Sequence, residues 1–283
     1  MICTLCPRRC GAERTETEGH GFCGMPAGLR VARAALHLWE EPPLSGTRGS
    51  GTVFFSGCTL RCCYCQNREI SAGGFGRAVT TGRLREIFEE LIAQGAHNIN
   101  LVTPTHFLPW ILPALEPKLP VPVVYNCGGY ERAETLRALE GKIDIYLPDF
   151  KYANPSLAAE LSGAADYFTV AAQAIREMVR QTGSPAWQGE KLAGGTIIRH
   201  LILPGQVDNS LRVLDWIGET FQPGQVLVSL MRQYTPMGGL AAPFDRRVTE
   251  EEYQAVLSWM YLNRLEGFTQ DAEAADSVYI PDF

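Results

Sequence analysis

Most of this 283-residue chain alternates short apolar segments with amphipathic ones, and this alternation constrains the fold more than any other feature. From Gly51 onward, six β-rich segments are apolar nearly throughout, which is typical of strands covered on both faces of a parallel sheet. The predicted strands are Thr52–Ser56, Ile99–Thr103, Val121–Asn126, Ile143–Asp149, Thr196–Leu203 and Val226–Arg232. The predicted helices are Thr81–Gln94, Phe107–Leu115, Arg132–Leu139, Asn154–Leu161, Tyr167–Gln181, Ser210–Phe221 and Thr249–Glu266. This pattern predicts an α/β fold, a partial (β/α)6 barrel with its active face at the carboxyl ends of the strands.

The composition is that of a folded protein with a large core. Hydrophobic residues make up 46% of the chain. The 31 acidic and 25 basic residues give a net charge of −6, so nucleic acid is not an expected partner. No apolar segment approaches the roughly 20 residues of a membrane-spanning helix, and residues 1–25 lack the apolar stretch of a signal peptide. We therefore expect a cytoplasmic protein with no membrane partner.

The chain has nine cysteines, and eight of them lie between residues 3 and 65. In a reducing cytosol, closely spaced thiols usually indicate metal binding rather than disulfides. Residues 1–50 are rich in Cys, Arg, Gly and Pro and lack long periodic segments. We therefore predict two parts, a small metal-binding appendage over residues 1–50 and the barrel domain over residues 51–283.

The loop that follows the first predicted strand contains Cys58, Cys62 and Cys65 in the spacing C-x3-C-x2-C. Three thiolates on a [4Fe–4S] cluster leave one iron without a protein ligand, as catalytic metal sites leave a position open. Structural zinc is an alternative, but it requires four ligands, and Cys63 is too close to Cys62 for easy joint ligation. A redox pair of Cys62 and Cys65 is another alternative, and it leaves Cys58 without a role.

With Tyr64 as its aromatic residue, this loop resembles the C-x3-C-x-aromatic-C signature of the radical S-adenosylmethionine (SAM) superfamily. Four segments are further similar to the glycyl-radical-activating branch, in particular to proteins described as pyruvate formate-lyase activating enzyme-like. These segments are residues 51–58, 100–106, 146–151 and 199–205. The resemblance implies that SAM binds the open iron and that an electron from the cluster splits it to methionine and a 5′-deoxyadenosyl radical.

The resemblance also implies a set of site residues. The catalytic and cluster-binding residues would be Cys58, Cys62 and Cys65. The SAM-binding residues would be Tyr64, Thr103, Thr105, Asn126, Asp149, Lys151 and Arg199. The activating enzymes usually have a Gly-Gly-Glu element after the second strand, whereas this chain has Thr103-Pro104-Thr105, which offers hydroxyls but no carboxylate. An Asp–Lys pair at a strand end also occurs as a simple local ion pair, and a lone Arg as a solvated charge.

The appendage has its own cysteine group, formed by Cys3, Cys6, Cys10 and Cys23 in the spacing C-x2-C-x3-C-x12-C. Four thiolates complete the tetrahedral coordination of one metal ion. We favour zinc, because a closed site can stabilise a weak fold, but a second iron–sulfur cluster fits the same ligands. Disulfide pairing is the alternative that a cytosolic location disfavours.

The resemblance thus implies a radical SAM enzyme that abstracts hydrogen from a glycine of a partner glycyl radical enzyme. The resemblance implies an electron donor such as flavodoxin or ferredoxin. The first alternative is a radical SAM enzyme that acts on a small molecule or on another protein side chain. The second is a non-catalytic iron–sulfur electron-transfer protein. Such carriers usually hold each cluster with four thiolates, and the loop at residues 58–65 lacks a well-spaced fourth.

Overall fold

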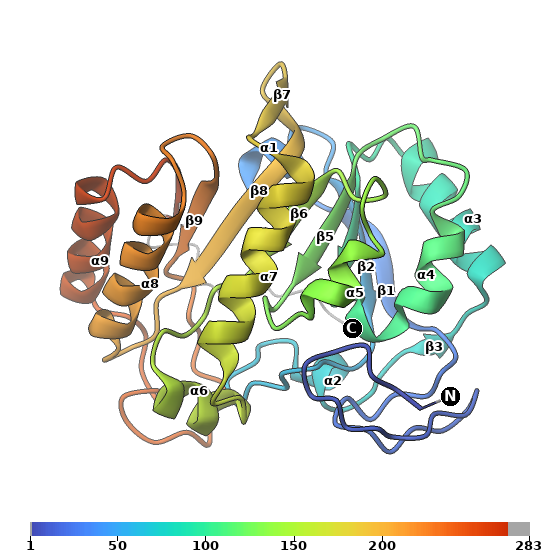
Figure 1. Ribbon diagram of the computed structural model, residues 1–283, viewed down its shortest axis with the longest axis horizontal. Helices are drawn as coiled ribbons and strands as arrows, with labels where there is room; N and C mark the ends of the chain where they lie inside the picture. The colour runs from blue at the N-terminus through green and yellow to red at the C-terminus, as the bar shows by residue number, and fades with distance from the viewer. Residues whose placement is uncertain (1, 271–283) are drawn as a thin grey trace.

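An open ten-stranded sheet dominates the computed structural model, which describes residues 2–270 (Figure 1). Six neighbouring strands run parallel to one another, and their order in space follows their order in the sequence. They are β2 (Ser50–Phe55), β4 (Ile99–Val102), β5 (Val123–Cys127), β6 (Ile145–Pro148), β8 (Lys191–Leu201) and β9 (Leu227–Met231). The six predicted strands and the partial-barrel fold class are confirmed.

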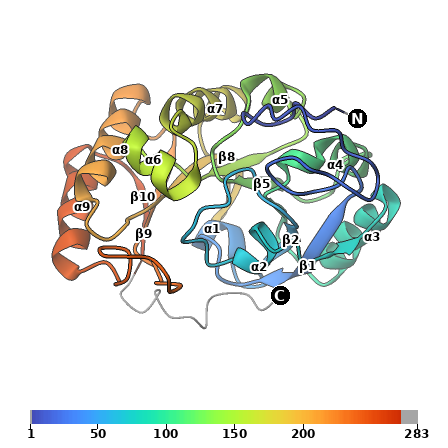
Figure 2. The same ribbon diagram turned by 90° about the horizontal axis from the view of Figure 1, so that it is seen from below.

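The helices that connect these strands lie in an arc outside them (Figure 2). They are α3 (Thr81–Ala93), α4 (Leu108–Ala114), α5 (Ala133–Arg137), α6 (Pro155–Ser162), α7 (Tyr167–Thr182), α8 (Val207–Thr220) and α9 (Glu250–Leu262). Local signals set where several of them begin. The Thr80 hydroxyl caps α3, and Thr249 and Glu252 form the capping box of α9 that the sequence indicates.

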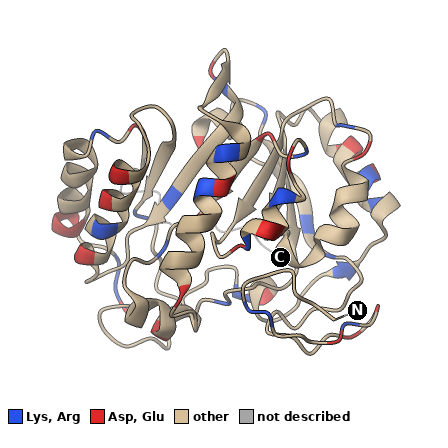
Figure 3. Cartoon of the chain, viewed as in Figure 1, with Lys and Arg blue, Asp and Glu red and all other residues tan. Residues whose placement is uncertain are grey.

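Charged side chains are interspersed along these outer helices (Figure 3). Acidic and basic residues form surface ion pairs, such as Arg83 with Glu90 at 2.6 Å and Arg180 with Glu140 at 2.9 Å. Exposed pairs of this kind contribute up to about 1 kcal/mol each. The apolar inner faces of the helices therefore provide most of the stability. Within residues 2–270, no helix is both long and apolar enough to cross a membrane.

Four further strands extend the sheet. They are β1 (Arg30–His37), β3 (Arg77–Ala78), β7 (Ala186–Gln188) and β10 (Gly267–Thr269). β1 pairs antiparallel with β2 along its whole length, from Val31 opposite Phe55 to His37 opposite Ser50. The predicted domain boundary between residues 50 and 51 therefore falls inside a continuous sheet. Polar residues interrupt β1, so it lacks the continuous apolar run by which the other strands were identified.

Three short helical turns complete the structure: α1 (Pro42–Ser45), α2 (Arg68–Ser71) and the 3-10 helix η1 (Thr105–Phe107). Leu44 of α1 is fully buried against the strand residues Val124, Ile145 and Ile197. In Figure 1 the strand arrows point toward the end of the barrel at which α2 lies, and α1 lies at the opposite end. The turn α1 thus covers the amino ends of the strands.

Candidate active site

A cavity of about 740 Å³ lies inside the open barrel. Its lining comes from the loop after β2, from the ends of the following strands, and from the segment between β1 and α1. The carboxyl ends of parallel strands meet at one edge of a sheet, so residues distant in sequence converge there. Among the predicted site residues, the lining includes Cys58, Cys62, Tyr64, Cys65, Thr103, Asn126, Asp149, Lys151 and Arg199.

The three cysteines of the loop lie close enough together for the charge of one thiolate to shift the pKa of another. Burial raises the pKa of the Cys58 thiol to about 12, and the nearby Cys62 and Cys65 act in the same direction. All are free thiols. In the described residues, no three His, Cys, Asp or Glu side chains stand in an arrangement ready to hold a metal ion. Cluster binding by this loop therefore remains a prediction.

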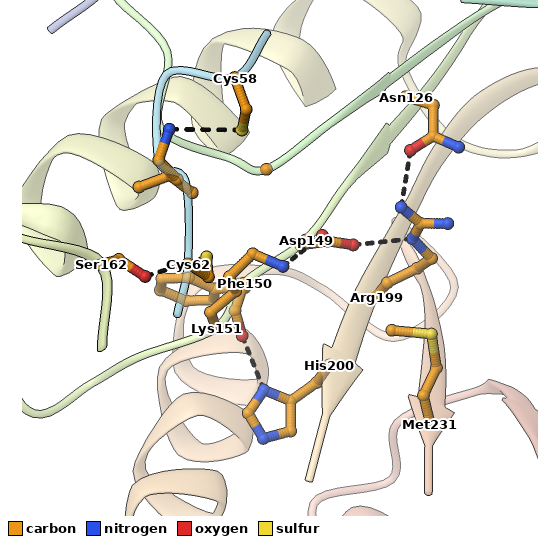
Figure 4. Close-up of polar contacts among 12 residues, drawn as sticks. Cys58, Cys62, Asn126, Asp149, Phe150, Lys151, Ser162, Arg199, His200 and Met231 are labelled. Carbon is orange, nitrogen blue, oxygen red and sulfur yellow. Dashed lines mark hydrogen bonds and ion pairs between the residues drawn. The ribbon is translucent and has the colours of Figure 1, made fainter. Parts of the chain in front are cut away.

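The surroundings of two of these sulfur atoms suit metal-bound thiolates. The Leu60 N–H donates to Cys58 Sγ at 3.4 Å, and the Ser162 hydroxyl donates to Cys62 Sγ at 3.0 Å (Figure 4). Hydrogen bonds to cysteine sulfur are among the groups by which proteins tune iron–sulfur clusters. Cys63 is exposed and is not part of the cavity lining, so it does not compete with its neighbours inside the cavity.

Tyr64 connects back to the cysteines through a chain of hydroxyl groups. Its hydroxyl lies 2.8 Å from that of Tyr152, which lies 2.7 Å from Ser162 Oγ. Because the Ser162 proton points to Cys62, Tyr152 donates to Ser162 and Tyr64 donates to Tyr152. All three hydroxyl residues are buried, so this chain lies inside the core.

Beyond the cysteines, Asn126 of β5, Asp149 and Lys151 after β6, and Arg199 of β8 form one buried network (Figure 4). Arg199 Nε donates to Asp149 Oδ1 at 2.8 Å, and Lys151 Nζ donates to Asp149 Oδ2 at 2.6 Å. Arg199 Nη2 donates to Asn126 Oδ1 at 2.6 Å. The side chains of the three charged residues are only 14–16% exposed. The ion pair that the sequence left open as an isolated local contact is therefore part of a network that faces the cavity.

The network stays ionised at neutral pH. Burial alone would raise the pKa of Asp149, but the charges of Arg199 and Lys151 outweigh it and hold this pKa below its usual range. Burial would lower the pKa of Lys151 and of Arg199, but nearby acidic groups, Asp149 foremost, together outweigh it and raise both. Lys151 also acts on the cysteine loop, where its charge lowers the pKa of Cys65 against the larger effect of burial.

The two threonines predicted to bind SAM lie in different surroundings. Thr103 lines the cavity, in the left-handed backbone region with φ of 57°, and its N–H donates to the Asn126 carbonyl at 2.8 Å. Thr105 is not part of the lining, because η1 places its side chain in the core, where the hydroxyl donates to Glu131 Oε1 at 2.7 Å. Burial raises the pKa of Glu131 to about 7. Thr105 is therefore not grouped with the other predicted SAM contacts.

Two carboxylates in the lining, Glu40 and Glu41, are not among the site residues predicted from the sequence. They follow β1 in the segment assigned to the appendage. Glu40 Oε2 lies 3.6 Å from Arg199 Nη1, which joins it to the charged network. The only signal in the sequence is a pair of adjacent acids before Pro42-Pro43, which is too common a pattern to indicate a site.

The four N-terminal cysteines lie near one another in the folded chain. Burial raises the pKa of the Cys6 thiol to about 12, and the charges of Cys23 and Cys3 act in the same direction. The charges of Cys3 and Cys10 similarly act on Cys23. These thiols, like those of the loop, do not stand in a metal-binding arrangement in the described structure. The second metal site remains a prediction.

Comparisons with known proteins agree with this fold. Residues 52–217 match the sequence model of the Radical SAM superfamily. The uncharacterized protein MJ0674 of Methanocaldococcus jannaschii is 30% identical over 267 residues, which cover 90% of this chain and 73% of that protein.

Solved structures show the same fold at low sequence identity. Streptococcus suis SuiB, bound to its precursor peptide SuiA, has a TM-score of 0.53 at 14% identity over 77% of this chain. The match covers 47% of the SuiB chain, so this chain spans about half of that protein's length. A radical SAM methyltransferase from Sphaerobacter thermophilus has a TM-score of 0.52 at 12% identity, over 87% of this chain and 77% of its own. Such likeness indicates the fold alone.

Proposed function

The chain belongs to the Radical SAM superfamily, and from this we propose that Cys58, Cys62 and Cys65 hold a [4Fe–4S] cluster at which the enzyme cleaves SAM. When bound and reduced, such a cluster supplies the electron that splits SAM into methionine and a 5′-deoxyadenosyl radical. One observation carries the assignment to these residues: the three thiols and the Asp149 network line the same cavity.

The chain's own residues would bind and orient the cofactor. Lys151 links the charged network to the cysteine loop, since it pairs with Asp149 and acts electrostatically on Cys65. Its ammonium group and the Arg199 guanidinium are suited to a carboxylate such as that of SAM. Thr103, Asn126 and Asp149 would complete the SAM contacts through hydroxyl, amide and carboxylate groups, and Tyr64 would contribute through its ring, because its hydroxyl is bonded to Tyr152.

For the hydrogen donor, we favour a glycine Cα of a partner glycyl radical enzyme. The support is the resemblance of residues 51–58, 100–106, 146–151 and 199–205 to the activating enzymes. The second candidate is a small molecule or another protein side chain, which is favoured by the carboxylates Glu40 and Glu41 because they supply the lining with groups that can recognise a specific substrate. An electron donor such as flavodoxin or ferredoxin would reduce the cluster in either case.

The test is the formation of 5′-deoxyadenosine by protein reconstituted without oxygen, with SAM and a strong reductant. The loop offers a matched pair of variants. Cys62→Ala should reduce the product to background, whereas Cys63→Ala should leave it unchanged, because Cys63 is turned out of the cavity. Product formation that persists in Cys62→Ala would contradict the assignment. Absence of the product in the wild-type protein would favour the electron-transfer alternative.

The hydrogen donor can be identified by isotope transfer. A candidate partner enzyme with α-deuterated glycine should deliver deuterium into 5′-deoxyadenosine and acquire a glycyl radical signal in electron paramagnetic resonance. Deuterium transfer from a labelled small molecule, with no signal on any protein partner, would instead establish the second candidate.

A further inference from the structure

The end of the cavity that lies away from the cysteine loop carries two buried carboxylates. Glu40 and Glu41 follow β1, whose last residue His37 pairs with Ser50 at the start of β2. Cys58 lies beyond the other end of β2, which at about 3.3 Å per residue is roughly 17 Å long. α1 and α2 lie at these two opposite ends in Figure 1. The carboxylate pair therefore faces the cavity from the side opposite the cysteines.

The backbone that bears the pair is held in place by specific contacts. Ser45 Oγ accepts from the Glu40 N–H at 2.9 Å and donates to the Glu40 carbonyl at 3.2 Å. Pro42 restricts the preceding Glu41 to an extended conformation, and its φ of −49° and ψ of 140° fit this restriction. Asn98 Nδ2 donates to the Leu44 carbonyl at 2.8 Å and holds α1 against the strands. The two side chains thus project from a preorganised turn.

Their hydrogen bonds are incomplete. Glu40 Oε1 accepts from Asn100 Nδ2 at 2.9 Å, and Glu40 Oε2 faces Arg199. Glu41 is only 8% exposed, yet its Oε2 has no hydrogen-bond partner within residues 2–270. Asn100 Oδ1 also has no partner in this part of the chain. Of the two, only Glu41 lines the cavity, and its carboxylate oxygen is an acceptor, so a ligand that satisfies it there would be a donor. An unsatisfied buried polar atom normally costs about 1–3 kcal/mol, and such atoms are concentrated at functional sites.

The charges of the cavity lining also favour a cationic ligand. The described lining has three carboxylates, on Glu40, Glu41 and Asp149, and two permanent cations, on Lys151 and Arg199. Asp149 already engages both cations at 2.6 and 2.8 Å, and Arg199 reaches Glu40 only at 3.6 Å. Burial also raises the pKa of both glutamates, and it outweighs the opposing effects of Arg199 on both, of Asn100 on Glu40 and of Ser229 on Glu41. A cationic ligand would compensate their negative charges.

We infer that Glu40 and Glu41 bind a cationic hydrogen-bond donor of the substrate, an ammonium or guanidinium group, at the end of the cavity opposite the cysteines. This inference rests on the proposed function in treating the cavity as the place where the substrate reacts. The cation can belong to a small amine or to a Lys or Arg side chain near the hydrogen donor of a protein substrate. The chemistry of recognition is the same in both cases.

The binding test uses n-butylamine as the probe and 1-butanol and butyrate as neutral and anionic controls. Reconstituted protein is titrated without oxygen, and the melting temperature and dissociation constant are measured. Butylamine should raise the melting temperature, and the two controls should not. In Glu41→Gln and Glu40→Gln, its dissociation constant should rise by about tenfold or more. Glu131→Gln, which alters a buried carboxyl outside the lining, should bind like the wild-type protein.

A second arm identifies the source of the cation. The peptide acetyl-Gly-Lys-Gly-amide is compared with its norleucine analogue. If the protein prefers the lysine peptide and Glu41→Gln abolishes this preference, the cation belongs to a protein side chain. If the protein binds butylamine but neither peptide, the cation belongs to a small amine. Because Glu41→Gln also removes an unpaired buried charge, it should raise the melting temperature without ligand, which confirms that the variant folds.

Three outcomes would overturn the inference. They are equal stabilisation by butanol or butyrate, undiminished amine binding in both glutamine variants, and a loss of SAM affinity in Glu41→Gln as large as the loss of amine affinity. The last outcome would place the pair in the cofactor site. None depends on 5′-deoxyadenosine formation, so this test and the test of the proposed function can fail separately.

Discussion

The Ser162 hydroxyl donates a 3.0 Å hydrogen bond to the Cys62 sulfur and thereby joins α6 to the cysteine loop. Tyr152 and Tyr64 extend this contact into a chain of hydrogen bonds. Tyr64, the aromatic residue of the cysteine motif, is thereby linked to the Cys62 sulfur. A buried chain of this kind is suited to hold a thiolate at one position and to adjust its electron density. This relationship leads to the first prediction.

Ser162→Ala should make the reduction potential of the reconstituted cluster more negative. A hydrogen bond to sulfur stabilises the more negatively charged, reduced state, and a bond worth about 1 kcal/mol corresponds to about 40 mV for one electron. Potentiometric titration followed by electron paramagnetic resonance measures the shift. Ser156→Ala, at an exposed position of the same helix, is the control. An unchanged or more positive potential in Ser162→Ala would contradict the proposed role of the hydroxyl.

Asp149→Asn should destabilise the fold by about 3 kcal/mol at neutral pH, because it leaves Lys151 and Arg199 largely buried without their carboxylate. The folded-state pKa of Asp149 lies below its usual range. The contribution of ionised Asp149 to stability is therefore present above the pKa of about 3.9 that Asp has in the unfolded chain. It is lost as the pH falls through the lower pKa of the folded state. The free energies of unfolding of the wild-type protein and the variant can be measured with urea from pH 7 to pH 3. The difference between them should become smaller as the pH falls. A difference independent of pH would disagree with this account.

Arg8→Ala should loosen the cysteine loop from a distance. The Arg8 guanidinium donates to the carbonyls of Thr59 at 2.9 Å, Ser162 at 2.6 Å and Gly163, and so links the N-terminal segment to both the loop and α6. Loss of these charge-assisted bonds should speed amide exchange over residues 58–65 by about tenfold or more. Arg9→Ala, at the exposed neighbouring position, should have no such effect. Equal exchange in both variants would show that the N-terminal segment does not stabilise the loop.

The N-terminal cysteines should hold zinc, independently of the cluster in the loop. Metal analysis of protein purified without oxygen should find zinc together with the iron of a single cluster. Cys6→Ser should lose the zinc and keep the iron, and Cys62→Ala should do the reverse. Iron in twice the expected amount, with no zinc, would show that the N-terminal group binds a second cluster instead.

The central strands and helices could be predicted from sequence because their signals are local. The parallel strands are mostly apolar, and residues such as Thr249 and Glu252 mark a helix start within four positions. β1 could not be predicted in this way, because polar residues interrupt it and its place in the sheet depends on antiparallel pairing with β2. The structure therefore begins the sheet at Arg30, twenty residues before the expected domain boundary.

The site was predictable only where the motif and the strand ends coincide. Cys58, Asn126 and Asp149 follow or end predicted strands, so their convergence follows from parallel topology. Glu41 reaches the same cavity because the antiparallel pairing of β1 returns the chain to the amino ends of the strands. Thr105 lies only two residues after Thr103, but a single helical turn directs it to Glu131. These placements depend on tertiary contacts that no short motif encodes.

The most direct test of the central claim is electron–nuclear double resonance on the reduced, reconstituted protein with SAM labelled with 15N at its amino group. If Cys58, Cys62 and Cys65 leave one iron open, the cluster signal should show coupling to the labelled nitrogen. A cluster signal that does not change when labelled SAM is added would contradict the account.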